Sequence, residues 1–271
     1  MKKRNPYLTA GLILTGVLTG VIILGFFWTP YDPNAMAAGP KLTGPSLAHL
    51  MGTDSFGRDI FSRVLKGAGT TYGIALCTVA VGAVCGTVLG AVTGYFGGIV
   101  DDVLMRLGDV LTAFPSILLA LVVISLLGPG KTGNVILALG LVFIPSFARM
   151  VRGKVLQVKE EDYIMATRSL GAKDSRIIFI HILKNCLPVI IVIATMRMAT
   201  SIISISTLSY LGMGVVPPQP EWGGMIATGK QYLWDAPSLI FIPGIAVMIT
   251  VICFNILGDK LRDILDPSLK D

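Results

Sequence analysis

Six long apolar runs constrain the fold of this chain more than any other feature. Each is about as long as the roughly 20 helical residues needed to cross a bilayer core of about 30 Å. They cover residues 7–28, 72–96, 103–127, 134–151, 187–211 and 238–257. None shows the period-2 alternation of a strand, and a helix satisfies its own backbone groups in lipid. The runs therefore predict an all-α integral membrane protein with six transmembrane helices.

The composition supports a chain that meets lipid over most of its length. Charged residues make up only 14% of the 271 residues, whereas a soluble domain carries about 25%. The net charge of +6 comes from basic residues beside apolar runs, so we interpret it as membrane topology and expect no nucleic-acid partner. The sparse histidines and cysteines predict neither a metal site nor a disulfide framework; they are His49, His181, Cys77, Cys85, Cys186 and Cys253.

The first run has two interpretations. Lys2-Lys3-Arg4, the apolar run and Ala35-Met36-Ala37 could together form a secretory signal with its cleavage site. However, the run of about 20 residues exceeds the usual signal core of roughly 7–15, and the small residues lie well beyond its end. We therefore expect residues 1–28 to form an uncleaved first transmembrane helix.

Lysines and arginines are distributed unequally between the two sides of the predicted spans. With the N-terminus inside, fifteen fall on the cytoplasmic side and six outside, which favours two cytoplasmic termini. The fifteen are Lys2, Lys3, Arg4, Arg106, Arg149, Arg152, Lys154, Lys159, Arg168, Lys173, Arg176, Lys184, Lys260, Arg262 and Lys270, and the six are Lys41, Arg58, Arg63, Lys66, Lys131 and Lys230. The predicted segments are then a first helix at 1–28, an extracytoplasmic segment at 29–71, a membrane core at 72–257 that includes a cytoplasmic loop at 152–186, and a cytoplasmic tail at 258–271.

Small residues and prolines predict how the spans pack. Four glycines repeat at every fourth position of the second run and form one face that allows close helix contact, within the chain or with a partner. They are Gly82, Gly86, Gly90 and Gly94. Pro115, Pro145 and Pro243 should kink their spans, either to line a path or to serve packing.

The ends of two predicted helices carry recognisable signals. Asp101 or Asp102 can cap the third helix and favour its N-terminal dipole. Pro188 fits the first turn of the fifth, where a missing N–H costs nothing.

A polar island at residues 160–184 interrupts the apolar pattern. Acidic residues open a predicted helix in which Ile164, Ala166 and Leu170 lie near one face, and Gly171 can end that helix in a left-handed turn. A second short helix is predicted over residues 174–183. The two would form a compact knob on the membrane surface that can transmit a push. The alternative is an amphipathic linker lying on anionic lipid, and spacing alone leaves both open.

The order of this island resembles the EAA loop of ABC importer permeases, the cytoplasmic element that docks into a cleft of the ATPase. The resemblance implies that eight residues couple the chain to the ATPase: Glu161, Tyr163, Ala166, Thr167, Leu170, Gly171, Ala172 and Lys173. One departure is visible, because Met165-Ala166-Thr167 stands where the family often has Glu-Ala-Ala. The usual acidic contact is therefore missing at Met165.

Four further segments are similar to those of dipeptide, oligopeptide and nickel permeases, in particular the "C" type subunit. They are LMGTDSFGRDIFSR at 50–63, LSYLGMG at 208–214, PPQPEWG at 217–223 and FNILGDKLRDILDP at 254–267. Together they extend over most of the chain from about residue 29 to 269.

The resemblance implies a type I ABC importer permease fold in a bacterial or archaeal cell membrane. It also implies a heterodimer with a related permease, two ABC ATPase subunits and an extracytoplasmic substrate-binding protein. The chain itself would be no enzyme and carry no cofactor, with ATP and Mg on the ATPases. The implied substrate is a di- or oligopeptide, and the alternative is nickel or a metal chelate.

A different class, a standalone proton-coupled carrier, would be expected to place acidic residues or histidine inside its spans. The spans here contain little beyond Asp109 and Arg197, and no inverted repeat is evident. Arg197 should face protein or water, because its burial in lipid costs about 2.5–3.5 kcal/mol. It can line the pathway and attract a peptide carboxylate, or form a structural ion pair with Asp109.

Three outer segments leave smaller questions. Residues 125–132, SLLGPGKT, approach a phosphate-binding loop but lack its first glycine and a preceding strand. Asp54 and Asp59 flank Gly57-Arg58 and predict a capped, ion-paired turn, or alternatively a contact with the binding protein. Trp222 and Trp234 are predicted interfacial anchors, with gating of the path as the alternative.

Overall fold

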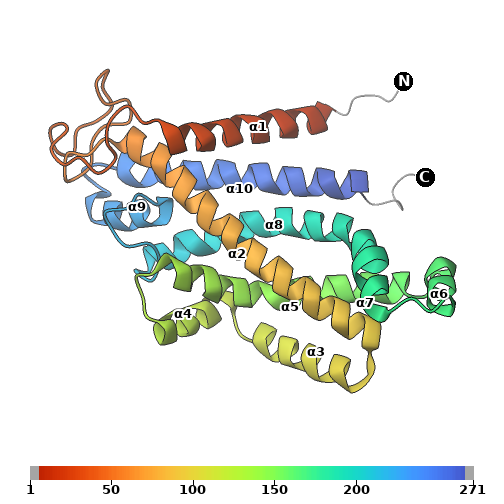
Figure 1. Ribbon diagram of the computed structural model, residues 1–271. Coiled ribbons are helices and arrows are strands. Elements are labelled where there is room, and N and C mark those ends of the chain that lie inside the picture. The colour runs from red at the N-terminus through yellow and green to blue at the C-terminus, as the bar shows by residue number, and fades with distance from the viewer. Residues whose placement is uncertain (1–5, 266–271) are drawn as a thin grey trace.

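The computed structural model describes residues 6–265, apart from the side chains of residues 6–15 and Leu18, and its regular structure there is helical (Figure 1). The elements are α1 (Pro6–Phe27), α2 (Ile60–Phe96), α3 (Gly98–Ala113), α4 (Ser116–Leu127), α5 (Thr132–Val158), α6 (Asp162–Ser169), α7 (Asp174–Arg176), the π-helical η1 (Ile177–Ile182), α8 (Leu183–Tyr210), α9 (Trp222–Gly229), the 3-10 turn η2 (Lys230–Tyr232) and α10 (Ser238–Leu265). Within the described residues the β-structure is one isolated bridge between Thr53 and Asp59. The predicted all-α class is confirmed.

The count of six spans is not confirmed as such. Among the described residues, four helices are long and apolar enough to cross a membrane: α2, α5, the continuous helix from Asp174 to Tyr210, and α10. The predicted third span is broken at Pro115, where α3 and α4 meet at 97°, and this bent pair can supply a fifth. The break has a local cause, since proline lacks a backbone N–H and forces the preceding residue, Phe114, out of the helical region to φ −89° and ψ 142°. The predicted first run forms the helix α1, which is not among these spans.

Several helices are longer than the apolar runs that predicted them. α2 begins at Ile60 rather than near residue 72, because the Asp59 side chain accepts a hydrogen bond from the Ser62 N–H at 2.7 Å and caps its first turn. The fifth helix also begins before its apolar run, so Pro188 lies inside α8 and not in its first turn. The expected caps of the third helix are also wrong: Gly97 occupies the cap position, and Asp101 pairs with Arg152 instead.

The predicted glycine face packs within this chain, against α5. A Cβ added to Gly86 would lie 2.5 Å from the Cβ of Phe147, and one added to Gly90 would lie 2.4 Å from the carbonyl oxygen of Ala148. Gly82 meets Phe143 and Gly94 meets Val155 in the same way. The helix backbones therefore approach more closely than any side chain would allow. Pro145 stays inside α5 and Pro243 inside α10 without a break in either helix.

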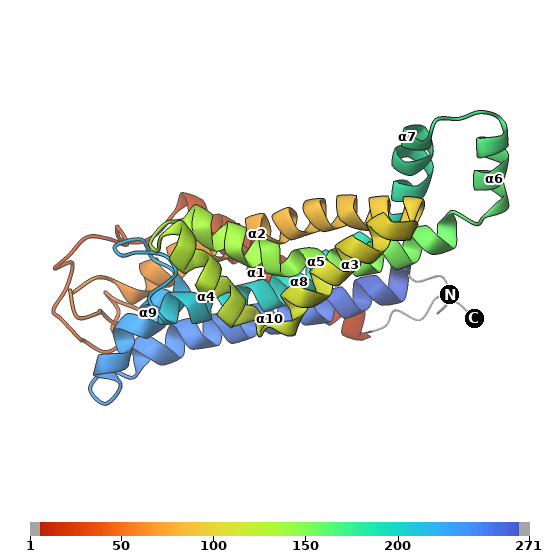
Figure 2. The ribbon, with the colours of Figure 1, turned by 90° about the horizontal axis from the view of Figure 1, so that it is seen from below.

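The two ends of the bundle differ in character (Figures 1 and 2). One end carries the segment before α2 together with α9, and the other carries α6 and the described ends of α1 and α10. The basic residues Lys2, Lys3, Arg4 and Lys270, which supported the predicted orientation, lie outside the described residues.

The segment before α2 is held by buried polar contacts, and the ion pairing predicted for this turn is observed at Asp54. Arg58 Nε donates to Asp54 Oδ2 at 2.6 Å, and His49 Nδ1 lies 2.9 Å from Asp59 Oδ1. Trp222 is not an interfacial anchor, since its side chain is buried and its Nε1 donates to the Val64 carbonyl at 3.0 Å. Trp234 is 93% exposed, which agrees with an anchoring role.

We predict that Gly86→Ala lowers the thermal unfolding midpoint of the purified protein complex, because overpacking of a close interface costs about 1–3 kcal/mol. Gly73→Ala is the matched control on the same helix, since a Cβ at Gly73 would meet nothing within 4 Å. Alanine there should be neutral or slightly stabilising, because it favours a helix over glycine by about 1 kcal/mol. Equal midpoints for both variants would contradict the packing described above.

Candidate functional site

The helix α6 and the turn after it project beyond the end of the bundle that carries α10's described end (Figure 2). Glu161 precedes α6 with extended φ −68° and ψ 140°, and its carbonyl accepts the first helical hydrogen bonds, from Ile164 at 2.9 Å and Met165 at 3.2 Å. Asp162 in the first turn and Arg168 in the last both match the helix dipole. The sequence thus specifies this short helix at both of its ends.

Gly171 ends α6 as predicted, in a left-handed conformation with φ 82°. The N–H of Ala172 bonds to the Thr167 carbonyl at 3.3 Å, and the N–H of Gly171 bonds to the Arg168 carbonyl at 2.9 Å. These two bonds form a Schellman motif, which closes the helix and reverses the chain. A β-branched residue would be strained at this position.

The predicted second short helix is wrong. α7, η1 and α8 form one continuous helix from Asp174 to Tyr210. Residues 174–183 are therefore the start of the membrane helix and not a separate short helix. The segment Ile177–Ile182 is wound as a π-helix, and such segments are frequent at functional sites. The continuity connects the turn at Gly171 directly to the interior of the bundle.

A buried apolar cluster fixes α6 to the bundle. Ile164 is 1% exposed and belongs to a cluster formed by residues of α2, α5, η1 and α8. Its other buried members are Ala91, Tyr95, Val151, Val155, Val158, Ile177, Ile178, Ile182 and Cys186. The predicted common face is wrong for Leu170 and Ala166, which are exposed while Ile164 is buried.

Polar contacts reinforce this attachment. The Tyr95 hydroxyl, in the last turn of α2, donates to the Asp174 carboxylate, and the Arg168 guanidinium lies over the Tyr95 ring with its Cζ 5.3 Å from the ring centroid. Asn185 Nδ2 donates to the Tyr163 hydroxyl at 3.0 Å. Sequence reasoning missed Tyr95, Asp174 and Asn185, because each is separated by many residues from the partner that gives it a role.

Three large apolar or aromatic side chains on α6 and at its C-terminal end are exposed. Tyr163, Met165 and Leu170 are 45%, 52% and 88% exposed, although they stand beside charged neighbours. Glu161, Gly171 and Lys173 are also exposed, whereas Thr167 and Ala172 are half-buried. An anchored short helix with an uncovered apolar surface is suited to bind a separate protein.

The candidate pathway residues lie elsewhere, on α3 and α8, and the predicted pair between them is not formed. Asp109 of α3 pairs with Arg149 of α5, with Nη1 2.9 Å from Oδ1. Arg197 of α8 lies over the Phe143 ring, with its Cζ 5.6 Å from the centroid. Sequence reasoning missed Arg149 as the partner of Asp109, although Arg149 lies within the predicted span at residues 134–151.

Chemistry by a bound group finds little support within residues 6–265. No three His, Cys, Asp or Glu side chains gather there as metal ligands. Residues 125–132 form the end of α4, a turn and the start of α5, and no strand of the described chain precedes them.

Comparison with known proteins agrees with this arrangement. A family model described as binding-protein-dependent transport system inner membrane component matches residues 86–271. The dipeptide transport system permease protein DppC of Alkalihalophilus pseudofirmus is 40% identical over 271 residues, covering 99% of this chain and 88% of the relative. The glutathione transport system permease protein GsiD of Pectobacterium atrosepticum is 43% identical, covering 95% and 87%.

One solved structure shares the fold. An inward-facing conformation of the MetNI methionine ABC transporter contains a chain that matches with a TM-score of 0.58 and 22% identity. The match covers 74% of this chain and 95% of that one. The likeness supports the type I permease fold of the described helices.

We predict that Tyr95→Phe increases backbone hydrogen exchange in α6, because it removes the hydroxyl that binds Asp174 while the ring under Arg168 is kept. The measurement is hydrogen–deuterium exchange of peptides from residues 160–175 in the assembled complex. Tyr210→Phe is the matched control, since it removes a hydroxyl from the outer end of α8. Unchanged exchange in the Tyr95 variant would show that the apolar cluster alone holds α6.

Proposed function

The chain belongs to the family of binding-protein-dependent transport system inner membrane components, as a permease subunit of an ABC importer. From that premise we propose which substrate it transports and how ATP hydrolysis is coupled to its movement. The substrate is a di- or oligopeptide. Support comes from relatives named for dipeptide and glutathione, both of which contain peptide bonds and a free carboxylate. These names favour a peptide over the alternative of nickel or a metal chelate.

Movement of the ATPase subunits is transmitted to this chain through α6. The proposed contact residues are Glu161, Tyr163, Ala166, Thr167, Leu170, Gly171, Ala172 and Lys173, which an ATPase subunit would grip from the cytoplasm. The observation that carries this proposal is the combination of a buried Ile164, at 1% exposure, with an outward Leu170, at 88%. A short helix that is anchored through Ile164 and leaves Leu170 uncovered at its end transmits force when a partner covers Leu170.

We propose a different set of partners for each end of the bundle. The end with α6 is proposed to be cytoplasmic, together with both termini, and to meet two ATPase subunits that hold ATP and Mg. The opposite end, with the ion-paired segment before α2, would receive substrate from an extracytoplasmic binding protein. A related permease would complete the path as the other half of a heterodimer.

The mechanism follows from the rigidity of these parts. When the ATPases close, α6 moves with them, and the Schellman turn at Gly171 passes the displacement to the helix from Asp174 to Tyr210. Because Tyr95 and Ile164 bind α6 to α2 and α5 as well, the closely packed helix pair would tilt with it. The path would then alternate between outward-open and inward-open states.

We predict that Gly171→Val abolishes ATP-driven uptake of a labelled dipeptide in the reconstituted complex, while membrane insertion persists. Valine is strained at φ 82°, so the Schellman turn opens and α6 loses its direction. Gly171→Asn is the matched control, because asparagine tolerates the left-handed region and should retain most uptake. Normal uptake in the valine variant would count heavily against α6 as the drive.

We also predict that Leu170→Asp lowers co-purification of the ATPase subunits by about tenfold or more, because burial of an unpaired charge at an interface is costly. Leu47→Asp is the matched control: Leu47 is fully exposed as well, but it lies in the segment before α2. That variant should keep its ATPases. If both variants retain them equally, the docking surface lies elsewhere.

A further inference from the structure

Three charged side chains from three helices are linked through α5. They are Asp109 of α3, Arg149 of α5 and Arg197 of α8. Asp109 pairs with Arg149 at 2.9 Å, and Arg197 contacts the ring of Phe143, which lies on the same helix as Arg149. All three lie within helices that cross the membrane or belong to the bent pair.

This cluster contains two cations and one anion. Arg149 uses only Nη1 towards the Asp109 carboxylate, and the same nitrogen lies 3.5 Å from the Thr112 hydroxyl. Arg197 rests on the Phe143 ring, and no carboxylate among the described side chains forms an ion pair with it. Two arginines and one aspartate leave a net charge of +1. The charge is costly in a membrane unless it faces water or an anion.

A neighbouring arginine on the same helix shows a contrasting arrangement. Arg152 binds Asp101 through two hydrogen bonds, with Nε 2.5 Å from Oδ1 and Nη2 2.6 Å from Oδ2. That pair is complete and joins α3 to α5. The cluster at Arg149 is incomplete by comparison, although it is built from the same residue types one turn away.

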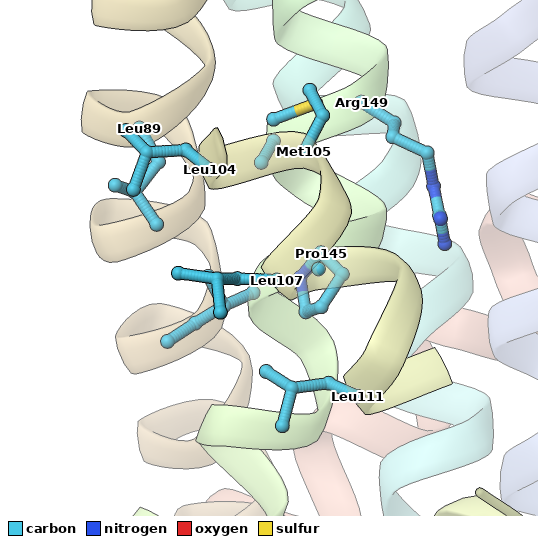
Figure 3. A pocket seen from close by; sticks show the side chains of 10 residues that line it. Leu89, Leu104, Met105, Leu107, Leu111, Pro145 and Arg149 are labelled. Carbon is cyan, nitrogen blue, oxygen red and sulfur yellow. The ribbon is translucent and has the colours of Figure 1, made fainter. Parts of the chain in front are cut away.

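The cluster is also accessible. The side chains of Arg149 and Asp109 are 46% and 66% exposed, and Arg197 is half-buried. Figure 3 shows that the guanidinium of Arg149 points away from Leu89 and Leu104 in the apolar pocket between α2, α3 and α5. The charged end of Arg149 therefore lies away from the apolar part of this pocket.

We propose that Arg149 and Arg197 form a transient site for the C-terminal carboxylate of the transported peptide. This inference rests on the proposed function, because it requires a peptide substrate. A carboxylate matches the guanidinium fork and supplies the missing negative charge. Asp109 holds Arg149 when the path is empty and competes with the passing carboxylate, which keeps the site weak enough to release its ligand.

The test compares two substrates that differ only in this charge: a labelled dipeptide and the same dipeptide with a C-terminal amide. Each is supplied on saturated binding protein to the reconstituted complex, so that differences in delivery affinity do not enter. We expect Arg197→Gln to lower uptake of the free acid by about tenfold, since a hydrogen bond to a charged group is worth about that factor. Uptake of the amide should stay near that of the unsubstituted protein, and Arg197→Lys should restore part of the preference for the acid.

Arg149→Gln provides a second variant with the same expected selective loss, should Arg197→Gln fail to assemble. Arg152→Gln is the matched control, because it removes an arginine from the same helix and should leave the ratio of acid to amide uptake unchanged. Equal losses for both substrates in the Arg149 and Arg197 variants, or no loss in an assembled complex, would overturn the site alone. An unsubstituted complex that imports neither peptide would overturn the proposed function and this site with it.

Discussion

The close contact between α2 and α5 is the constraint on which the other helices depend. Four glycines on α2 leave no room for a Cβ, so the backbones of the two helices lie against each other through Phe143, Phe147, Ala148 and Val155. In lipid, association of helices relies on such packing rather than on a hydrophobic force between them. The main core continues from this pair into α4 and α8, and the buried cluster beneath α6 is formed at its inner end. A displacement at either end must therefore move both helices together.

This arrangement explains why a projecting helix of eight residues can act on a bundle. α6 is too short to be stable alone, because isolated helices below about 12–15 residues are marginal in water. It is held by Ile164 in the apolar cluster and by Arg168 against Tyr95, whose hydroxyl binds the start of the next helix at Asp174. The local signals, Asp162 at one end and Gly171 at the other, define its limits. Its orientation comes from tertiary contacts, and that orientation is what a partner would use.

The charges inside the bundle divide into completed and incomplete pairs. Arg152 and Asp101 satisfy one another and join α5 to α3, and Asp54 and Arg58 form a buried pair within the segment before α2. Arg149, Arg197 and Asp109 leave a positive charge without a protein partner in the described chain. With a peptide as the proposed substrate, an arginine that lacks a carboxylate partner would be free to bind the carboxylate of the peptide. The same residue type would then join helices in one place and contact substrate in the other.

The sequence alone determined the helical class, the glycine face, the break near Pro115, the limits of α6 and the left-handed turn at Gly171. These features depend on residues close in the chain: apolar length, a four-residue repeat, a missing N–H and a missing Cβ. The tertiary structure decided what the pattern left open. Residues 174–183 are continuous with the fifth span, and Leu170 is exposed while Trp222 is buried. Asp109 forms its ion pair with Arg149 and not with Arg197. Those outcomes depend on which helices become neighbours, and a one-dimensional pattern contains no distance between residues that lie 40 or more positions apart.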